Sequence, residues 1–524
     1  MTYAESLTSS VLRALPLPPT RRVDAFRSDP VATQRRLLLR LLDRAAGTEW
    51  GRRFRFEEIL RAPDPVAAYQ ERVPLHDYEA YREDVERIRR GEPDVIWPGR
   101  FTNFAVSSGT ASAGKIIPVS DEMLQSNRSF SVAVGLNYLR QTGNKTYLRG
   151  KHLTLPGRIE EDPKFPGTMI GEVSGLQAEH APRFFQLLYQ AVPNEVSFLP
   201  NWERKLHAIA ERTITMDVRS LVMAPTWALV FFRELLERHR QRTGRSARHV
   251  AEVWPNLQVF ISGGVALSSY RDLLCETIGK PDLHFIETYG ASEGFFSFQD
   301  DLRDPSMLLH LDNGVFFEFV RMDELGMPDP RRLTIADVDV DVRYALFVTT
   351  CSGLWSYGVG DVVRFTSTAP HRILVAGRTS EMIDRYGEAV FGEEARAALQ
   401  AACEGTGARV RDYHVAPKPP DVDRLPAHQW LIEFEQSPAS ADTFASIIDE
   451  YLCEVNRHYQ IRREAGAFDP PEIVMLPEGS FYRWLVKTKG RVSGQTKVPR
   501  LSEERAIADD VLTVVRSRPA TEPG

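Results

Sequence analysis

The stretch from Leu257 to Gly294, LQVFISGGVALSSYRDLLCETIGKPDLHFIETYGASEG, decides the fold. Two short apolar runs, Leu257–Ser262 and Leu283–Thr288, predict strands, and the segment Tyr270–Gly279 between them predicts a helix. A strand, a helix and a second strand in this order predict a parallel pair covered by the helix. Ligands of such sheets bind beyond the carboxyl ends of the strands, where both runs are followed by glycine turns.

The same alternation extends outward from this unit. Further strands are predicted at 101–106, 115–119 and 220–223, and further helices at 24–46, 121–140 and 228–240. After Gly377 the pattern changes to that of a small α+β domain, with helices at 393–403 and 441–459 and strands at 409–415, 429–434 and 472–476. We therefore expect an α/β fold: a large N-terminal domain with mostly parallel sheets, residues 1–377, and a small mobile C-terminal α+β domain, residues 378–524.

Composition excludes several classes of protein. A net charge of −6 without a basic tail gives no electrostatic footprint for nucleic acid. The four cysteines, Cys275, Cys351, Cys403 and Cys453, are too far apart for a zinc knuckle or a disulfide framework. The start of the sequence lacks the pattern of a signal peptide, and no apolar run reaches the ~20 residues that span a bilayer. We expect a cytoplasmic protein that binds small molecules and neither membrane nor nucleic acid.

A glycine-rich loop resembles a nucleotide-binding P-loop. Gly109-Thr-Ala-Ser-Ala-Gly114-Lys115 matches G-x-x-x-x-G-K, but the next residue, Ile116, has no hydroxyl to hold magnesium. Pro118 also disfavours the helix that a P-loop lysine begins, so a strand–loop–strand arrangement is predicted. The hydroxyls and glycines of the loop still suit a polyphosphate, although a polar surface loop has the same composition.

Three further motifs follow in order. They are Tyr289-Gly-Ala-Ser-Glu293-Gly294, Tyr357-Gly-Val-Gly-Asp361, and the stretch from Gly377-Arg378 to Gly387-Glu388 at the expected domain boundary. Together with the serine- and glycine-rich loop, they resemble the acyl-adenylate-forming superfamily, which includes acyl-CoA synthetases, luciferases and peptide-synthetase adenylation domains.

A closer resemblance runs from about Tyr69 to Arg500. Val73-Pro74 with Tyr78, the loop Ser107-Ser108-Gly109-Thr110, and Trp254-Pro255 are similar to the auxin-responsive Gretchen Hagen family of acyl acid amido synthetases. The C-terminal part resembles that family more than acyl-CoA synthetases, through three features: Asn456, Tyr459 and Arg462 in an N-x-x-Y-x-x-R pattern, the segment 471–481, and Ser493-Gly-Gln495-Thr-Lys497-Val-Pro499-Arg500. Two positions differ from the family pattern: Gly114 directly precedes Lys115, and Gly358 stands where the family has arginine.

The resemblance implies a bound ATP, a magnesium ion and two catalytic residues. By the resemblance, Lys497 would be a mobile catalytic residue that reaches the α-phosphate, and Glu293 would be a magnesium ligand. The implied nucleotide-binding residues are Ser107, Ser108, Gly109, Thr110, Ser112, Gly114, Lys115, Gly263, Gly264, Tyr289, Gly290, Ala291, Ser292, Asp361 and Arg378. Among them, Tyr289 is expected against adenine and Asp361 at the ribose hydroxyls.

The expected reaction is ATP-dependent activation of a small carboxylic acid as an acyl-adenylate, followed by transfer of the acyl group to an amine of the amino acid type. Side-chain character suggests that Tyr138, Val173 and Trp227 line the acid pocket. Two alternatives stay open: an acyl-CoA or acyl-carrier ligase that shares the first step, and a non-catalytic nucleotide-binding relative. The sequence identifies neither the acid, the amine, the general base nor the oligomeric state.

Overall fold

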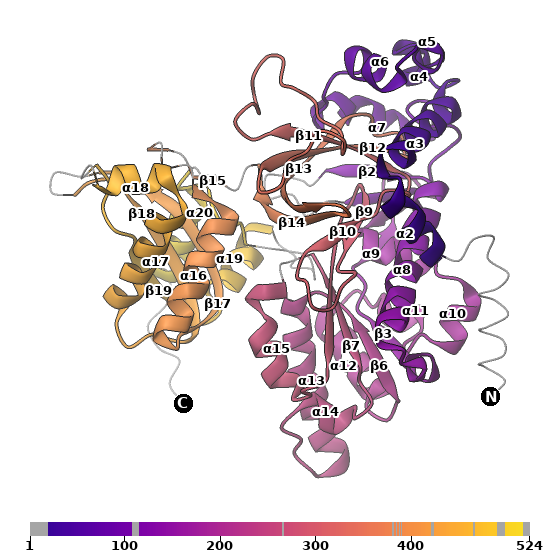
Figure 1. The fold of residues 1–524 in the computed structure, drawn as a ribbon. Coiled ribbons are helices and arrows are strands. Elements are labelled where there is room, and N and C mark those ends of the chain that lie inside the picture. The colour runs from indigo at the N-terminus through magenta and orange to yellow at the C-terminus, as the bar shows by residue number, and fades with distance from the viewer. Residues whose placement is uncertain are drawn as a thin grey trace. The chain divides into compact units, whose positions relative to one another are not determined.

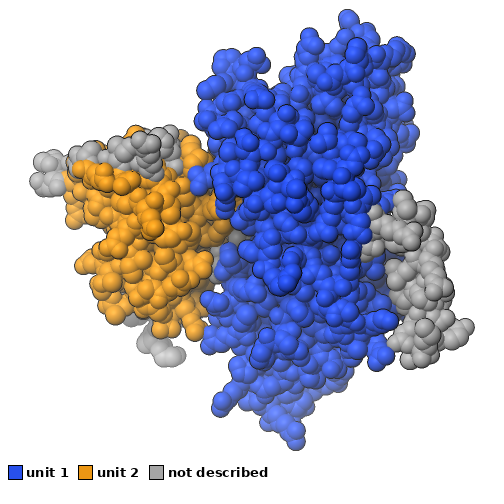
Figure 2. All heavy atoms as spheres, in the orientation of Figure 1, with its two compact units in different colours: residues 1–359, 363–374 blue, residues 360–362, 375–524 orange. Residues whose placement is uncertain are grey.

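The computed structural model describes residues 19–106, 115–264, 267–379, 382–383, 385–386, 388, 390–420, 424–464, 467–489, 498–502 and 504–516. The chain forms two compact units (Figure 2). The larger unit contains residues 1–359 and 363–374, and the smaller contains 360–362 and 375–524. The division after Leu374 lies close to the boundary expected at Gly377-Arg378. No helix among the described residues is long and apolar enough to span a membrane.

A ten-stranded sheet dominates the fold (Figure 1), in the order β11-β12-β13-β14-β10-β9-β8-β7-β6-β3. Its strands are β3 (Lys151–Thr154), β6 (Val218–Val222), β7 (Val259–Gly263), β8 (His284–Ala291), β9 (Gly294–Phe298), β10 (Met307–Leu309), β11 (Val315–Arg321), β12 (Arg343–Thr350), β13 (Tyr357–Thr368) and β14 (His371–Arg378). The strands β3, β6, β7 and β8 pair in parallel, as the opening stretch predicts.

The rest of this sheet corrects the expectation of mostly parallel sheets. β8 pairs antiparallel with β9, β9 with β10, and β10 with β14. The reason is local: a hairpin at Ser292-Glu293 reverses the chain directly after β8, so no crossover helix can follow. The α/β class holds, and the sheet is mixed.

Helices cover the parallel strands and enclose a core. They are α12 (Trp202–Thr213), α13 (Pro225–Thr243), α14 (Val250–Val253) and α15 (Arg271–Ile278). Their apolar faces meet the sheet in one buried cluster that includes Leu221, Phe231, Trp254 and Phe260. Burial of this cluster fixes which face of the parallel strands the helices cover.

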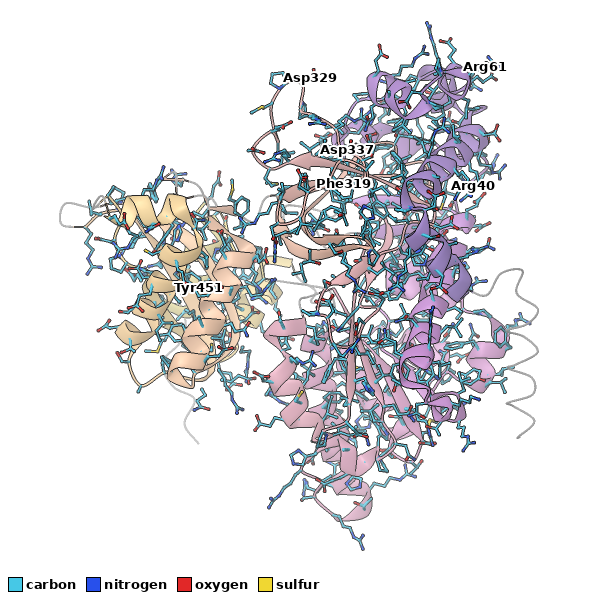
Figure 3. All side chains as sticks on the ribbon, in the orientation of Figure 1. Arg40, Arg61, Phe319, Asp329, Asp337 and Tyr451 are labelled. Atoms are coloured by element: carbon cyan, nitrogen blue, oxygen red, sulfur yellow. The ribbon has the colours of Figure 1, made fainter. Side chains whose placement is uncertain are left out.

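A second, four-stranded sheet has the order β2-β1-β5-β4. Its strands are β1 (Asn103–Val106), β2 (Ile116–Val119), β4 (Ile159–Glu161) and β5 (Met169–Gly171). The remaining helices of the larger unit are α2 (Pro19–Ser28), α3 (Pro30–Ala45), α4 (Glu49–Arg53), α5 (Phe56–Arg61), α6 (Pro65–Arg72), α7 (Arg82–Arg89), α8 (Asp121–Thr142), α9 (Val173–Glu179), α10 (Arg183–Leu188) and α11 (Asn194–Ser197), with single turns at 79–81, 145–149 and 267–269. Figure 3 labels the buried Phe319 of β11 and the exposed Arg40 and Arg61 of α3 and α5.

The smaller unit has the predicted α+β character. Its three-stranded sheet has the order β17-β18-β19, with strands β17 (Arg409–Lys418), β18 (Ala427–Gln436) and β19 (Glu472–Leu476). A two-stranded ribbon is formed by β15 (Met382–Ile383) and β16 (Val390–Phe391). The helices are α16 (Gly392–Thr406), α17 (Ala441–Val455), α18 (Arg457–Glu464), α19 (Ser480–Lys489) and α20 (Ala506–Arg516).

Two predicted helices are each broken in two. The segment 24–46 divides at Asp29-Pro30, where the Asp29 carboxylate caps α3 and Pro30 occupies its first position. The segment 441–459 divides at Asn456, whose side-chain oxygen accepts from the Tyr459 amide at 2.9 Å and whose nitrogen donates to Glu394 at 2.8 Å.

Candidate functional site

The phosphate-loop candidate lies between two paired strands. β1 and β2 run antiparallel, and Phe104 faces Pro118 in their register. Pro118 therefore sits inside a strand, which confirms the predicted strand–loop–strand arrangement and excludes a P-loop helix after Lys115. Ser107, Ser108, Gly109, Thr110, Ser112 and Gly114 lie outside the described residues.

Two tyrosines support the chain where this loop ends. The Lys115 Nζ atom lies 5.8 Å from the ring centre of Tyr357. The Ile116 amide donates to the Tyr78 hydroxyl at 2.9 Å. Tyr357 is fully buried and meets the ring of Tyr81 edge-on, with the ring centres 5.7 Å apart. The Lys115 ammonium therefore lies near the buried ring of Tyr357, directly after the loop.

The glycine turn after β7 has a structural cause. A Cβ atom at Gly263 would lie 2.8 Å from Thr288 Oγ1, which itself donates to the Ser262 carbonyl at 2.8 Å. Gly264 adopts a φ of +85°, a conformation that favours glycine. These contacts explain both glycines, and their proposed contact with adenine stays a prediction.

The motif at residues 289–294 forms the hairpin between β8 and β9. Tyr289, Gly290 and Ala291 end β8, and Ser292 and Glu293 make the turn. The Tyr289 ring is buried and packs against Phe296 with ring centres 5.2 Å apart. A Cβ atom at Gly290 would lie 2.5 Å from the Phe295 ring, so only glycine fits there.

Glu293 is only 5% exposed although it occupies a turn. Burial, and after it the charge of the nearby Glu293 carboxylate, raises the pKa of the Tyr357 phenol far above its usual value. The phenol therefore stays protonated and presents an O–H group to the surroundings of this carboxylate. Lys115, Tyr357 and Glu293 are thereby brought together from three distant parts of the sequence.

A single buried carboxylate suits a magnesium ion that arrives with a nucleotide. Among the described residues there is no group of three His, Cys, Asp or Glu side chains that could hold a metal. Magnesium is commonly bound through one or two carboxylates plus substrate phosphates and water. The residues present fit such an ion, with Glu293 as the protein ligand.

In the smaller unit, two predicted nucleotide-binding residues contact each other. Arg378 Nε lies 3.3 Å from Asp361 Oδ1. The Asp361 side chain is 8% exposed and that of Arg378 is 48% exposed. Gly360 has a φ of +85°, and its carbonyl accepts from the Thr379 amide at 2.9 Å. The motifs at 357–361 and 377–378 therefore form one local structure.

The three acid-pocket candidates do not lie together. The Tyr138 hydroxyl lies 3.4 Å from His284 Nδ1, where β8 begins, so it is at the amino ends of the parallel strands. Trp227 begins α13 just after β6, at the opposite ends of the strands, and stacks edge-on against Trp202 at 4.2 Å. Val173 is buried at the start of α9, which packs on β1. Tyr138 therefore lies near the ends of the parallel strands opposite the glycine turns, and its place in an acid pocket stays a prediction.

One predicted site residue lies outside the described residues, and two residues near the site were given no role from the sequence. Lys497 lies outside the described residues. Tyr78 and Tyr357 were part of the recognised motifs but received no role from the sequence. Their signal was an aromatic residue beside a glycine- or proline-containing motif, which alone does not distinguish a site residue from a core residue.

Gly358 occupies a crowded position. Its amide donates to the His76 carbonyl at 2.8 Å, and a Cβ atom there would lie 3.1 Å from the Phe347 ring. A larger residue at this position requires Phe347 to move. The packing of Phe347 against Gly358 therefore leaves little room for the arginine that the family has at this position.

The fold is similar to those of two solved ligases. The fold matches 2-hydroxyisobutyryl-CoA ligase in complex with 2-HIB-AMP, with a TM-score of 0.57, 13% identity, and coverage of 93% of this chain and 92% of that one. A GH3.15 acyl acid amido synthetase matches with a TM-score of 0.75 and 18% identity over 93% of each chain.

The chain belongs to the GH3 family. This is the Gretchen Hagen family that the sequence motifs resemble. The models of the GH3 N-terminal domain match residues 20–164 and 139–283, the central domain matches 308–378, and the C-terminal domain matches 393–506. The probable indole-3-acetic acid-amido synthetase GH3.2 of Oryza sativa subsp. japonica is 24% identical, covering 90% of this chain and 88% of that protein. The indole-3-acetic acid-amido synthetase GH3.8 of Oryza sativa subsp. indica is 26% identical over 92% of this chain and 89% of that protein. The resemblance to amide-forming ligases is thus confirmed.

Proposed function

We propose that this chain is an ATP-dependent acyl acid amido synthetase. Family membership along three successive domains is the observation that carries the proposal. The grouping of Lys115, Tyr357 and Glu293 supports it, since it provides a cation and a carboxylate beside the loop predicted to hold phosphates. The acyl acceptor is an amine of the amino acid class, by analogy with relatives named amido synthetases.

The first step joins the substrate carboxylate to ATP. A carboxylate oxygen attacks the α-phosphorus, the bond between the α- and β-phosphates breaks, and pyrophosphate leaves with the electron pair. The loop 107–114 and Lys115 bind the β- and γ-phosphates, and Lys497 stabilises charge at the α-phosphate. Glu293 would hold a magnesium ion, which would neutralise part of the phosphate charge.

The remaining nucleotide contacts are assigned residue by residue. Asp361 accepts hydrogen bonds from the ribose hydroxyls, and Arg378, its ion-pair partner, adds a positive charge near that acceptor. Tyr289 and the backbone of residues 263–264 and 290–292 lie against the adenine. These roles are part of the proposal.

The second step forms the amide. The amine nitrogen attacks the acyl carbonyl carbon, the bond from that carbon to the AMP oxygen breaks, and the nitrogen loses a proton. Because AMP is a good leaving group, alignment of the two reactants supplies most of the acceleration. Val173 and Trp227 are proposed to line the acid pocket.

Two assays separate this function from its alternatives. Purified protein with ATP, magnesium and a panel of acids that includes indole-3-acetate and 2,4-DB should exchange pyrophosphate into ATP and yield hydroxamates with hydroxylamine. Amino acids, and not coenzyme A, should then give acyl products in mass spectrometry. Products with coenzyme A alone would make the chain an acyl-CoA ligase, and ATP binding without exchange would make it a non-catalytic relative.

The role of Lys497 has a matched control. Lys497→Ala should slow pyrophosphate exchange by about 100-fold or more while ATP affinity is retained. Lys487→Ala removes an exposed lysine of α19 in the same unit and should leave exchange within twofold of wild type. Full exchange in Lys497→Ala would remove this lysine from the mechanism.

A further inference from the structure

A buried polar cluster lies directly before Tyr357. Ser356 is the residue that precedes the ring supporting Lys115, and it is fully buried. Its φ is +45°, in the left-handed region that residues other than glycine rarely adopt. An L-residue keeps such a conformation only where its surroundings hold it there.

Four neighbours hold Ser356. Its hydroxyl donates to Glu318 Oε2 at 2.6 Å and accepts from Arg332 Nη2 at 2.6 Å. Its amide donates to Thr349 Oγ1 at 2.9 Å, and the Tyr69 hydroxyl lies 3.0 Å from its Oγ atom. Every polar atom of this residue that points into the cluster thus has a fixed partner.

The cluster is anchored to rigid elements of the larger unit. The Glu318 side chain is fully buried on β11, and its other oxygen accepts from Arg332 Nη2 at 2.7 Å and Nε at 3.0 Å. Arg332 also donates to the Gln70 carbonyl of α6 at 2.6 Å. The position of Ser356 is therefore set by β11, by α6 and by Thr349 of β12.

The start of β13, which follows Ser356, also forms backbone hydrogen bonds with His76. The His76 amide donates to the Ser356 carbonyl at 2.9 Å, and the Gly358 amide donates to the His76 carbonyl at 2.8 Å. Tyr357 lies between these two bonds, so its backbone is fixed on both sides. The rotamers open to its ring depend on this fixed backbone, which enters Tyr357 from the strained conformation at Ser356.

We propose that Ser356 and Glu318 are positioning residues for the phosphate site, because they lock the conformation that places the Tyr357 ring against Lys115 and beside Glu293. This inference rests on the proposed function, since it needs a nucleotide at that site. Neither residue contacts substrate. The strain at Ser356 is tolerated because the hydrogen bonds of the Glu318–Arg332 pair compensate for it.

Two substitutions of one residue separate positioning from general stability. Ser356→Ala removes the hydroxyl and keeps the strain, whereas Ser356→Gly removes the hydroxyl and tolerates the positive φ. Affinity for ATP is measured by calorimetry on the full chain, once with magnesium chloride and once with EDTA. Apo-protein unfolding is followed in parallel.

The expected results are specific. Ser356→Ala and Glu318→Gln should weaken ATP binding in the presence of magnesium by about tenfold or more, and Ser356→Gly should bind within threefold of wild type. Asp300→Asn is the control, because it breaks an equally buried carboxylate–arginine pair at the far end of β9 from Glu293; it should lower the unfolding midpoint but bind within threefold.

Three other results would contradict the inference, and one of them would also contradict the proposed function. Wild-type protein that binds no ATP would overturn the proposed function and this inference with it. Wild-type protein that binds ATP, together with unchanged affinity in Ser356→Ala and Glu318→Gln, would overturn the inference alone. Equal losses in Ser356→Ala, Ser356→Gly and Asp300→Asn would also overturn it, because they would report general destabilisation.

Discussion

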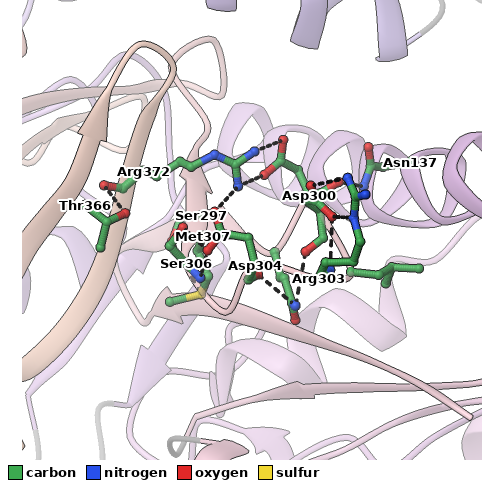
Figure 4. A network of polar contacts seen from close by, with 12 residues as sticks. Asn137, Ser297, Asp300, Arg303, Asp304, Ser306, Met307, Thr366 and Arg372 are labelled. Atoms are coloured by element: carbon green, nitrogen blue, oxygen red, sulfur yellow. Dashed lines mark hydrogen bonds and ion pairs between the residues drawn. The ribbon is translucent and has the colours of Figure 1, made fainter.

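Two buried carboxylates, Glu318 and Asp300, have the same chemistry and different consequences. Both side chains are fully buried, and each forms an ion pair with an arginine of low exposure, Arg332 and Arg372. Asp300 joins α8, through Asn137, to the start of β14 and also binds Arg27 of α2, as Figure 4 shows for Arg372 and Asn137. Glu318 instead binds a strained residue next to Tyr357. One pair fastens elements together, and the other sets a conformation.

The first test compares the stability contributed by the two pairs. Glu318→Gln leaves Arg332 buried without its charged partner and should lower the free energy of unfolding by about 3–5 kcal/mol. Asp300→Asn should lower it less, because Arg372 keeps Asp304 as a second carboxylate at 3.5 Å. Chemical denaturation followed by tryptophan fluorescence measures this. A loss under about 1 kcal/mol in either variant would contradict the assignment of that pair as buried and structural.

The second test compares the two ends of β9. Glu293→Gln should reduce pyrophosphate exchange by about 100-fold to 1,000-fold, since it removes the carboxylate proposed to bind magnesium beside the phosphate site. Asp300→Asn, at the other end, should reduce exchange less than threefold. Similar losses in both variants would mean that the fold, and not Glu293, was being measured.

The third test uses a buried cation without an ion pair. Lys205 is 3% exposed, donates to the Pro156 carbonyl at 2.6 Å, and forms no ion pair with a carboxylate among the described residues. Burial lowers its pKa to about 8, against an ordinary value of 10.5. Between these values the unfolded chain holds a proton that the folded chain has lost, so this group makes stability rise with pH.

Replacement of this lysine isolates its contribution. The unfolding free energy of wild type minus that of Lys205→Met should rise by about 2–3 kcal/mol from pH 8 to pH 10.5 and stay flat between pH 6 and pH 7. A difference that falls with pH would contradict the assignment of Lys205 as an ammonium whose pKa burial lowers.

The smallest effect is expected at Gly358. Gly358→Ala should destabilise the protein by about 1–2 kcal/mol, because its Cβ atom meets the Phe347 ring. Phe347→Leu in the same chain should recover part of that loss, which a double-mutant cycle detects. Strict additivity of the two substitutions would show that they do not contact.

Local signals predicted much of the fold. Pro118 alone predicted that a strand, and not a P-loop helix, follows Lys115. The alternation of strand and helix patterns in residues 257–294 predicted the parallel strands. The hairpin at Ser292-Glu293 was missed because the same motif was read as a turn at the end of a parallel strand. The division of the helix at Asn456 depends on Glu394, which is 62 residues away, and no local pattern shows it.

The candidate site was predicted less completely. Motifs singled out Lys115, Glu293, Asp361 and Arg378, but the contact of Lys115 with Tyr357 and the ion pair of Arg378 with Asp361 depend on strand register. Tyr138 was proposed for the acid pocket from side-chain character alone, which does not show that its hydroxyl lies beside His284, where β8 begins. The Ser356 cluster joins residues 69, 318, 332, 349 and 356, so no spacing in the sequence could reveal it.

The central claim is that distant segments of this chain converge on one bound nucleotide. Hydrogen–deuterium exchange of the wild-type protein, with and without ATP and magnesium, tests it most directly. We expect added protection together in peptides covering 101–120, 286–298 and 355–359, and none in the peptide around Asp300–Ser306. Protection confined to one of these segments, or absent from all three, would contradict it.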